Sequence, residues 1–400
     1  MIEALLKGDC SLKVDLKHSL KSNYHLRKKI DQIEDGLGVD SWKKSRLENI
    51  TWNEQHAREP IEFRHWDIIE CTKWRLRQPA YAEHLSYAPH QWFDEQGSRV
   101  YNEIHTANWW WERQVRISPP MGFNATPRAV YGVLTGIQTL LDDGDTVIPT
   151  IFMSDATHLT NFSGDKKAWP VYMMIGNLSA SAHTATAMHC VLLVALLPIA
   201  IKMRDIPLSW YNEQKEHNRM IMQHVLHHIL GPLMHADRRV FFAWCSDGHF
   251  RRCVASPAAW ITNYPEHRDL HNIKNGVCYW CECPKAEMGQ LPVRPYPMRD
   301  HDKYSALNIA TTTASARLAS FDVHQGSNVF WDLDCVTSDL PKPDLLHTMQ
   351  LGMLKNLLGW LLMFLKQHKR FEAFNNIWLS VPAYLDMAQL RRMYEEVSSW

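Results

Sequence analysis

Two aspartates stand directly behind apolar runs, where a pair of acids can hold a metal ion. The first is Asp155, which closes the β-branched run TVIPTIFMSD at 146–155. The second is Asp247, which follows the apolar segment 240–245 within RRVFFAWCSDGHFRRC. Segment 240–245 is typical of a short buried strand, and Asp247 with the next glycine marks the turn that ends it.

The chemistry of this pair depends on where the two strands lie. If the strands are parallel neighbours, both carboxylates project from one edge of a sheet. Two such carboxylates repel each other unless a cation lies between them. Two Mg²⁺ ions (or Mn²⁺) about 4 Å apart would activate water or a 3′-hydroxyl and stabilise the leaving oxygen. We therefore predict that Asp155 and Asp247 are catalytic acids that bind magnesium.

Each aspartate also has a structural alternative. An Asp-Gly pair most often caps its own turn, so Asp247 taken alone favours a turn residue. Asp165, in NFSGDKKAW, competes with Asp155 for the first acid, but its Ser-Gly setting favours a solvated or capping role. The matching positions of Asp155 and Asp247 behind two strands favour the metal site.

Three cysteines are clustered in GVCYWCECPKAEMG. The spacing of Cys278 and Cys281 is that of one half of a tetrahedral zinc site. A redox pair would instead need a helix start in a thioredoxin-like unit, which the surrounding sequence does not suggest. The best further ligand is His347, on a helix predicted at 343–360, although a core histidine is the alternative. Cys283 can replace or supplement a ligand, and we predict a structural Zn²⁺ site.

Length and composition limit the class of protein. Four hundred residues, 46% hydrophobic and 22% charged, suit a folded chain of two or three domains. Basic and acidic residues number 43 each, so any nucleic-acid surface must be a local patch. Nine cysteines and no signal-peptide pattern indicate an intracellular, reduced protein. The most apolar stretch, 190–201, has 12 residues and is too short to cross a bilayer, so we expect a soluble protein without a membrane partner.

The elements that must position the acids follow a definite order. Predicted strands at 146–155, 168–178 and 190–199 precede a long helix at 209–236 and the strand at 240–245. Three strands, a crossover helix and a strand returning beside the first are typical of an RNase H-like sheet, by fold analogy. We predict an α/β fold: an RNase H-like mixed sheet with flanking helices, a zinc-binding insertion and a mainly helical N-terminal region.

Changes in composition predict the domain boundaries. Consecutive Trp109, Trp110 and Trp111 are more often a hydrophobic lid over a core than a base-stacking platform. The segment at 126–145 has helical apolar spacing and stops at Asp-Gly. The predicted units are a charged, weakly structured or helical lead-in at 1–60, an aromatic-rich and mainly helical region at 61–140, the catalytic core at 141–265, the Cys-x-x-Cys insertion at 266–340 and an incomplete helical segment at 341–400.

Several blocks in this order resemble the Plavaka transposases of fungal genomes, which are relatives of the CACTA group. The blocks are TVIPTIFMSDATHLTNFSGDKKAWPVYMMIGNL, the CSDGHFRR turn, the Cys-x-x-Cys and KPDLLHTMQLGMLKNLLGW, with NWWWERQ upstream. The resemblance implies a nuclear DDE transposase with an RNase H-like core. Such an enzyme cuts DNA at terminal inverted repeats and joins the freed 3′ ends to target DNA, with a divalent metal.

The resemblance also implies roles for single residues. Asp155 would be the first catalytic acid and Asp247 the second. Cys278 and Cys281 would lie in a zinc-binding insertion that is completed from the segment containing His347.

Two departures from the family pattern bear on activity. Asn356 stands where relatives often carry a second histidine. The pattern also continues past Trp400 into a segment with the best candidate for the third acid, so we expect a C-terminally truncated chain. Glu395 and Glu396 resemble ordinary charges on an exposed helix face.

Double-stranded DNA is the expected partner, both as transposon ends and as target, and a homo-oligomer is compatible with this function. Candidate DNA contacts are the pair Arg251 and Arg252 and the cluster Arg27, Lys28 and Lys29, although short charge runs are usually solvated surface. Two alternatives stay open. One is a decayed or domesticated DNA-binding protein without catalysis, and the other is a different RNase H-like nuclease.

Overall fold

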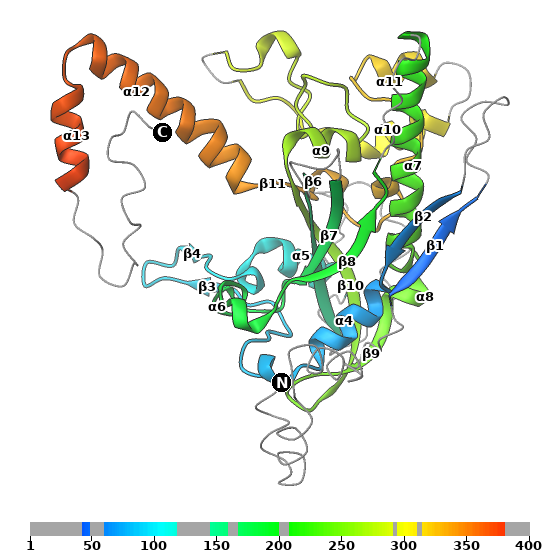
Figure 1. Ribbon diagram of the computed structural model, residues 1–400. Helices are drawn as coiled ribbons and strands as arrows, with labels where there is room; N and C mark the ends of the chain where they lie inside the picture. Colours follow the sequence, from blue (N-terminus) through cyan, green and yellow to red (C-terminus); the bar gives the residue numbers. More distant parts are fainter. Residues whose placement is uncertain are drawn as a thin grey trace, which may run out of the picture.

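A long mixed β-sheet forms the centre of the protein, with helices against its faces (Figure 1). The computed structural model describes residues 42–48, 60–117, 145–158, 167–199, 208–290, 294–309 and 314–380. In these residues the main sheet has nine strands, in the order β1-β2-β8-β7-β5-β10-β11, with β6 beside β7 and β9 beside β10. The strands are β1 (Lys43–Leu47), β2 (Ile61–His65), β5 (Thr146–Ser154), β6 (Thr157–His158), β7 (Lys167–Ile175), β8 (Leu192–Leu197), β9 (Val240–Trp244), β10 (Phe250–Thr262) and β11 (Pro341–Pro343).

The middle of the sheet is an antiparallel meander followed by parallel strands. β5 pairs with β7, and β7 pairs with β8, both antiparallel. On the other side of β5, β10 runs parallel to it, with Cys253 opposite Thr146 and Ile261 opposite Met153. β11 runs parallel to β10. The carboxyl ends of β5, β10 and β11 therefore meet at one edge of the sheet.

The sequence patterns located four strands of the sheet and the long helix. β5, β7 and β8 occupy the three predicted strand ranges, and the helix α7 (Leu208–Met234) matches the predicted helix. The predicted strand at 240–245 is present as β9, but its expected place beside the first strand is wrong. β9 pairs antiparallel with β10, and β10 is the strand beside β5. Two arginines and a proline interrupt the run 250–262, so it lacks the uniform apolar pattern of a buried parallel strand.

Helices cover both faces of the β5–β10 pair, which explains why β5 is apolar along its length. Successive side chains of a strand point to opposite faces. Ile148 packs in the main core with residues of α7 and of α4 (Ile68–Leu76), whereas Val147 packs on Trp110 of α5 (Asn108–Ile117). Trp110 is fully buried, so the predicted lid is confirmed there, while Trp111 is exposed.

The N-terminal region contributes strands as well as helices. β1 pairs with β2, and β2 joins the main sheet through β8. A separate hairpin consists of β3 (Trp92–Phe93) and β4 (Arg99–Val100). The described part of the region predicted to be mainly helical, 61–117, contains β2, β3 and β4 beside its helices. The helix predicted at 126–145 lies outside the described residues, except for Asp145 at its end. Other predicted residues also lie outside them: Asp165, Glu395, Glu396, Arg27, Lys28 and Lys29.

Residues after β10 form short helices and a helical arm. The short helices include α9 (Tyr264–Leu270), α10 (His301–Ile309), α11 (Ala314–Ala319) and η6 (Val329–Trp331). The arm consists of the π-helix η8 (Leu346–Leu354), α12 (Lys355–Gln367) and α13 (Phe371–Ser380), and extends away from the sheet (Figure 1). By length and composition, Leu346–Gln367 could cross a membrane, and none of it is buried. The most apolar stretch of the sequence, 190–201, instead contains β8, and one apolar helix of this kind is weak evidence for a span.

Candidate functional site

Polar residues follow each of the three parallel strands where they meet at the carboxyl edge. Asp155 follows β5, Asn263 follows β10 and Asp344 follows β11. The pairing of Ile261 with Met153 and of Thr262 with Pro343 brings these three positions side by side. Ligands of open α/β sheets bind outside the carboxyl ends of the strands. We therefore take this edge as the candidate site.

Asp155 is exposed at this edge, on a firmly held strand end. Its Oδ1 accepts a hydrogen bond from Asn263 Nδ2 at 3.3 Å. The preceding residue, Ser154, is buried, and its carbonyl accepts the Thr262 hydroxyl at 2.7 Å. The carboxylate is thus accessible to a ligand, while the backbone that carries it is bound to β10.

Asp344 lies two strands away and starts the helical arm. Its backbone N–H donates to the carbonyl of Thr262 at 3.2 Å, which continues the β10–β11 pairing. One carboxylate oxygen accepts the backbone N–H of His347 at 2.9 Å, and the other contacts His347 Nδ1 at 2.8 Å. Through the backbone N–H of His347, Asp344 caps the start of the arm. His347, the predicted zinc ligand, is paired with this aspartate.

The Cys-x-x-Cys loop packs beside the same edge. The Tyr279 ring stacks on His267 with centroids 4.6 Å apart, and His267 Nε2 contacts the carbonyl of Lys342 in β11 at 2.8 Å. Cys278 Sγ accepts the backbone N–H groups of Trp280 at 3.3 Å and of Cys281 at 3.4 Å. Two backbone amides therefore point at one sulfur of the Cys-x-x-Cys pair.

These cysteines nevertheless do not assemble with other ligands in the part of the chain that the structure describes. There, no group of three or more histidine, cysteine, aspartate or glutamate side chains is placed to hold a metal ion. The zinc site predicted from Cys278, Cys281 and His347, with Cys283 as a supplement, thus stays a prediction. The magnesium site of Asp155 and Asp247 is likewise not formed by these residues.

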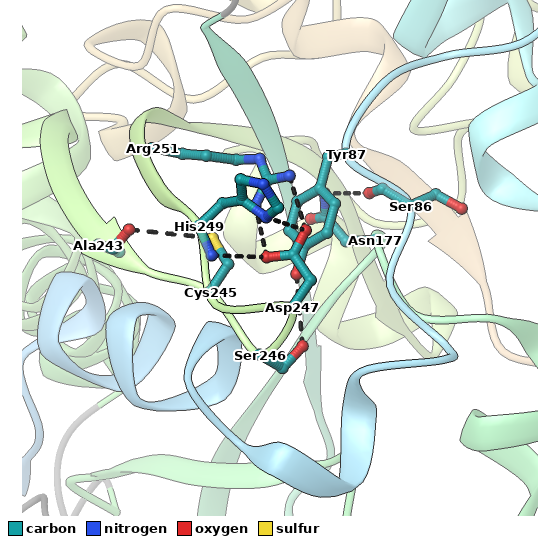
Figure 2. Close-up of polar contacts among 9 residues, drawn as sticks. All are labelled: Ser86, Tyr87, Asn177, Ala243, Cys245, Ser246, Asp247, His249 and Arg251. Carbon is teal, nitrogen blue, oxygen red and sulfur yellow. Dashed lines mark hydrogen bonds and ion pairs between the residues drawn. The ribbon is translucent and has the colours of Figure 1, made fainter.

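Asp247 lies in the turn between β9 and β10 and faces Arg251 (Figure 2). Two bonds of 2.7 Å join the guanidinium of Arg251 to both carboxylate oxygens. The backbone N–H of His249 donates to Oδ1 at 3.2 Å, so Asp247 also caps its own turn. The hydrogen bonds from Arg251 lower the pKa of Asp247 to about 2. The arginine in turn lies over the Tyr87 ring, 3.8 Å from its centroid.

The expected meeting of Asp155 and Asp247 is wrong. Asp155 lies beyond the carboxyl end of β5, whereas Asp247 lies before the amino end of the parallel strand β10. The 13 residues of β10 lie between them, roughly 40 Å of strand at about 3.3 Å per residue. Figure 1 shows β9 and β11 at opposite ends of the sheet. One metal centre cannot use both acids, because the strand before Asp247 is antiparallel to β10 and not parallel to β5.

A family comparison gives the context for this geometry. A model of the Plavaka transposase family matches residues 20–361. The match covers more than half of the 400 residues and includes β5, the Cys-x-x-Cys loop and His347. The chain belongs to the Plavaka transposase family. No curated protein matches the sequence.

In this member of the Plavaka transposase family, the predicted DNA contacts Arg251 and Arg252 both have acidic partners. Arg251 is bound to Asp247, and Arg252 is bound to the buried carboxylate of Asp145. Their side chains are 21% and 24% exposed. A DNA phosphate would have to compete with these carboxylates, so both contacts stay predictions.

Two residues of the candidate edge were missed by sequence reasoning. Asn263 and Glu266 belong to TNYPEH, where an asparagine precedes Tyr-Pro-Glu. Asparagine before a helix with proline near its start and glutamate three residues on is a recognisable helix N-terminus. This signal predicts α9. Contact with Asp155 could not be inferred from it, because that contact depends on the pairing of β5 with β10.

Proposed function

We propose that this protein is a nuclear DNA transposase that cleaves DNA strands and joins 3′ ends at the carboxyl edge of β5, β10 and β11. The observation that carries the proposal is the position of two acids, Asp155 and Asp344, behind parallel strands on either side of β10. Membership of a transposase family makes DNA the substrate. The rule that sheet ligands bind at carboxyl strand ends favours this edge over the turn that contains Asp247.

We further propose that the sheet is an RNase H-like core. The order β8-β7-β5-β10-β11 supports this proposal, because it combines a three-stranded antiparallel meander with two parallel strands beyond the first strand. The long helix α7 precedes the returning strand, as the fold analogy requires.

In this proposal Asp344 replaces Asp247 as the partner of Asp155. Two strand spacings of about 4.8 Å separate the backbones by roughly 10 Å, a distance that two aspartate side chains leaning together can bridge through a bound ion. Asp344 would first have to release His347. When bound, Mg²⁺ or Mn²⁺ would activate the attacking oxygen and stabilise the leaving one. The described residues do not complete such a site. Further ligands would therefore have to come from elsewhere.

A zinc site at the Cys-x-x-Cys loop is a second part of the proposal. The Cys-x-x-Cys spacing supports this part, and the backbone N–H groups of Trp280 and Cys281 both point at Cys278 Sγ. Metal analysis of purified protein tests this part. Bound zinc that is lost in the double variant Cys278→Ser/Cys281→Ser supports the site, and equal zinc content in both proteins contradicts it.

A DNA-binding protein without catalysis is the second candidate function. The two-bond pairing of Asp247 with Arg251 favours it, because this acid is not available to a metal ion. Binding would then persist in chelator and weaken with salt, since phosphate contacts release counterions.

Cleavage of double-stranded DNA carrying the element's terminal repeats separates these functions. With Mg²⁺ or Mn²⁺, we expect nicking that falls by at least about 100-fold in Asp155→Asn and in Asp344→Asn, because each loses a charged ligand. Asp247→Asn is the control and should nick at the wild-type rate per folded molecule. Unimpaired nicking by Asp155→Asn would overturn the site, and DNA binding without nicking would support the non-catalytic function.

A further inference from the structure

A chain of hydrogen bonds joins Asp155 to the corner between β10 and α9. Asn263 occupies this corner as the N-cap of α9, and its Oδ1 accepts the backbone N–H of Glu266 at 3.0 Å. Its Nδ2 donates to Asp155 Oδ1 at 3.3 Å. One amide side chain therefore binds both the helix start and the carboxylate, so the orientation of the carboxylate depends on the position of α9.

Glu266 holds the residue before Asp155 from the interior. Glu266 is 6% exposed, and its Oε1 accepts the Ser154 hydroxyl. The same hydroxyl accepts the indole N–H of Trp260 at 2.8 Å, and the Ser154 carbonyl accepts the hydroxyl of Thr262 at 2.7 Å. Side chain and carbonyl of Ser154 are thus both bound to the β10–α9 corner. The exposed turn after β5 is held by a buried polar network.

The charge of Glu266 fits a supporting role. Burial raises the pKa of the Glu266 carboxyl, and the negative charge of Asp155 acts in the same direction, while the hydrogen bond from Ser154 opposes them. Burial and Asp155 both disfavour a second negative charge beside the Asp155 carboxylate. The Ser154 hydroxyl is the hydrogen-bond donor that lowers the pKa of this buried carboxyl most.

We propose that Asn263 and Glu266 are positioning residues for Asp155: they fix the turn after β5 so that the Asp155 carboxylate faces outward at the carboxyl edge. This inference rests on the proposed function of that edge and adds two residues that act through Asp155. Residues that hold a catalytic or metal-binding group in place typically contribute about 10- to 100-fold in activity or metal affinity.

Asn263→Ser tests the link to Asp155. Serine keeps an N-cap acceptor for α9, but its side chain is too short to donate to Asp155. We expect the cleavage rate per folded molecule to fall by about 10- to 100-fold and the Mn²⁺ concentration for half-maximal cleavage to rise. The control is Asp67→Ser, at the N-cap of α4, where Asp67 accepts from Ile69 N at 2.9 Å. A wild-type rate in Asn263→Ser, or a loss no greater than in the control, overturns the proposal.

Glu266 variants separate positioning from chemistry. Glu266→Gln keeps an oxygen for the Ser154 hydroxyl and should retain most of the cleavage rate, whereas Glu266→Ala removes that acceptor and should lower the rate. If Glu266→Gln abolishes cleavage while its melting temperature stays near wild type, Glu266 takes part in the reaction itself, and a positioning role is wrong.

A readout without DNA keeps this inference distinct from the proposed function. If wild-type protein cleaves no DNA, the proposed function is refuted but the positioning role is not. The proposal would then depend on the carboxyl ¹³C signal of Asp155 in protein with labelled aspartate, assigned by its loss in Asp155→Asn. At fixed pH this signal should move in Asn263→Ser and not in Asp67→Ser. An unmoved signal in Asn263→Ser overturns the positioning role.

Discussion

At the scale of single residues, Asp247 shows how an acid in a promising sequence context can have a structural role. The aspartate forms a two-bond pair with Arg251 and caps its turn through His249. Asp155 is exposed and its partner is a neutral amide, Asn263. An acid that already balances an arginine has little charge left for a metal ion. This difference in partners separates the two aspartates, although both follow apolar runs.

The substitution Asp247→Asn tests this assignment. Asparagine still accepts the backbone N–H of His249 but loses the charge that pairs with Arg251, so we expect a loss of about 1–2 kcal/mol in the free energy of unfolding. The pKa of Asp247 is lowered to about 2 in the folded protein. The pairing therefore stabilises the fold at pH values above the usual aspartate pKa, and this stability is lost as pH falls toward 2. Urea unfolding at pH 7 and pH 3 measures both effects. Asp237→Asn, in the short helix before β9, is the control. Unchanged stability combined with lost cleavage would restore a catalytic role for Asp247.

At the scale of secondary-structure elements, the contact between the end of β7 and β5 allows no side chain at Gly176. A Cβ added there would lie 2.9 Å from Pro149 Cβ and 3.1 Å from Ile104 Cγ2. The Gly176 N–H donates to the Pro149 carbonyl at 2.8 Å. Proline is rare within a central strand because it cannot donate to a ladder. The small glycine allows the chain after β7 to approach β5 closely at this point.

Gly176→Ala should therefore loosen the β5–β7 contact. We expect destabilisation of about 1–3 kcal/mol from overpacking, measured by thermal or urea unfolding. Gly231→Ala, within α7, is the matched control, because a Cβ there meets nothing within 4 Å. It should be neutral or stabilising by up to about 1 kcal/mol. Equal effects of the two substitutions would contradict the close approach at Gly176.

At the scale of the whole molecule, buried histidines join the segment after β10 to the rest of the core. His271 stacks on Phe330 of η6 with centroids 4.9 Å apart and lies 5.6 Å from the ring of His301 in α10. Neither ring nitrogen of His271 has a hydrogen-bond partner among the described residues. Burial lowers the pKa of His301 to about 4 and that of His271 well below its usual range. Both side chains are therefore held in the neutral form.

This cluster predicts acid unfolding. The unfolded chain binds protons below about pH 6.5, the usual histidine pKa, while the folded histidines do not. Stability is therefore fully present above that pH and falls as pH drops from 6.5 toward 4, by about 1.4 kcal/mol per pH unit for each histidine. His271→Phe keeps the stack on Phe330 and cannot be protonated, so its acid midpoint should move to lower pH. His249→Gln, at an exposed turn histidine, should leave the midpoint unchanged, and equal midpoints in all three proteins would exclude this cause.

The sequence by itself determined the family and the central elements β5, β7, β8 and α7. These elements have local sequence patterns: a β-branched run in β5, apolar runs in β7 and β8, and apolar residues three and four apart in α7. Such patterns indicate which residues are buried and whether a segment is a strand or a helix. The position of Asp155 at a strand end follows from them.

Only the tertiary structure decided which residues Asp155 meets. Its neighbours are Asn263 and, one strand further, Asp344, because β10 and not β9 lies beside β5. Strand pairing depends on contacts between segments about a hundred residues apart in sequence. The alternation of side chains along one strand does not show which other strand it pairs with. For this reason Asp247 looked equivalent to Asp155 in the sequence and lies at the opposite end of the sheet.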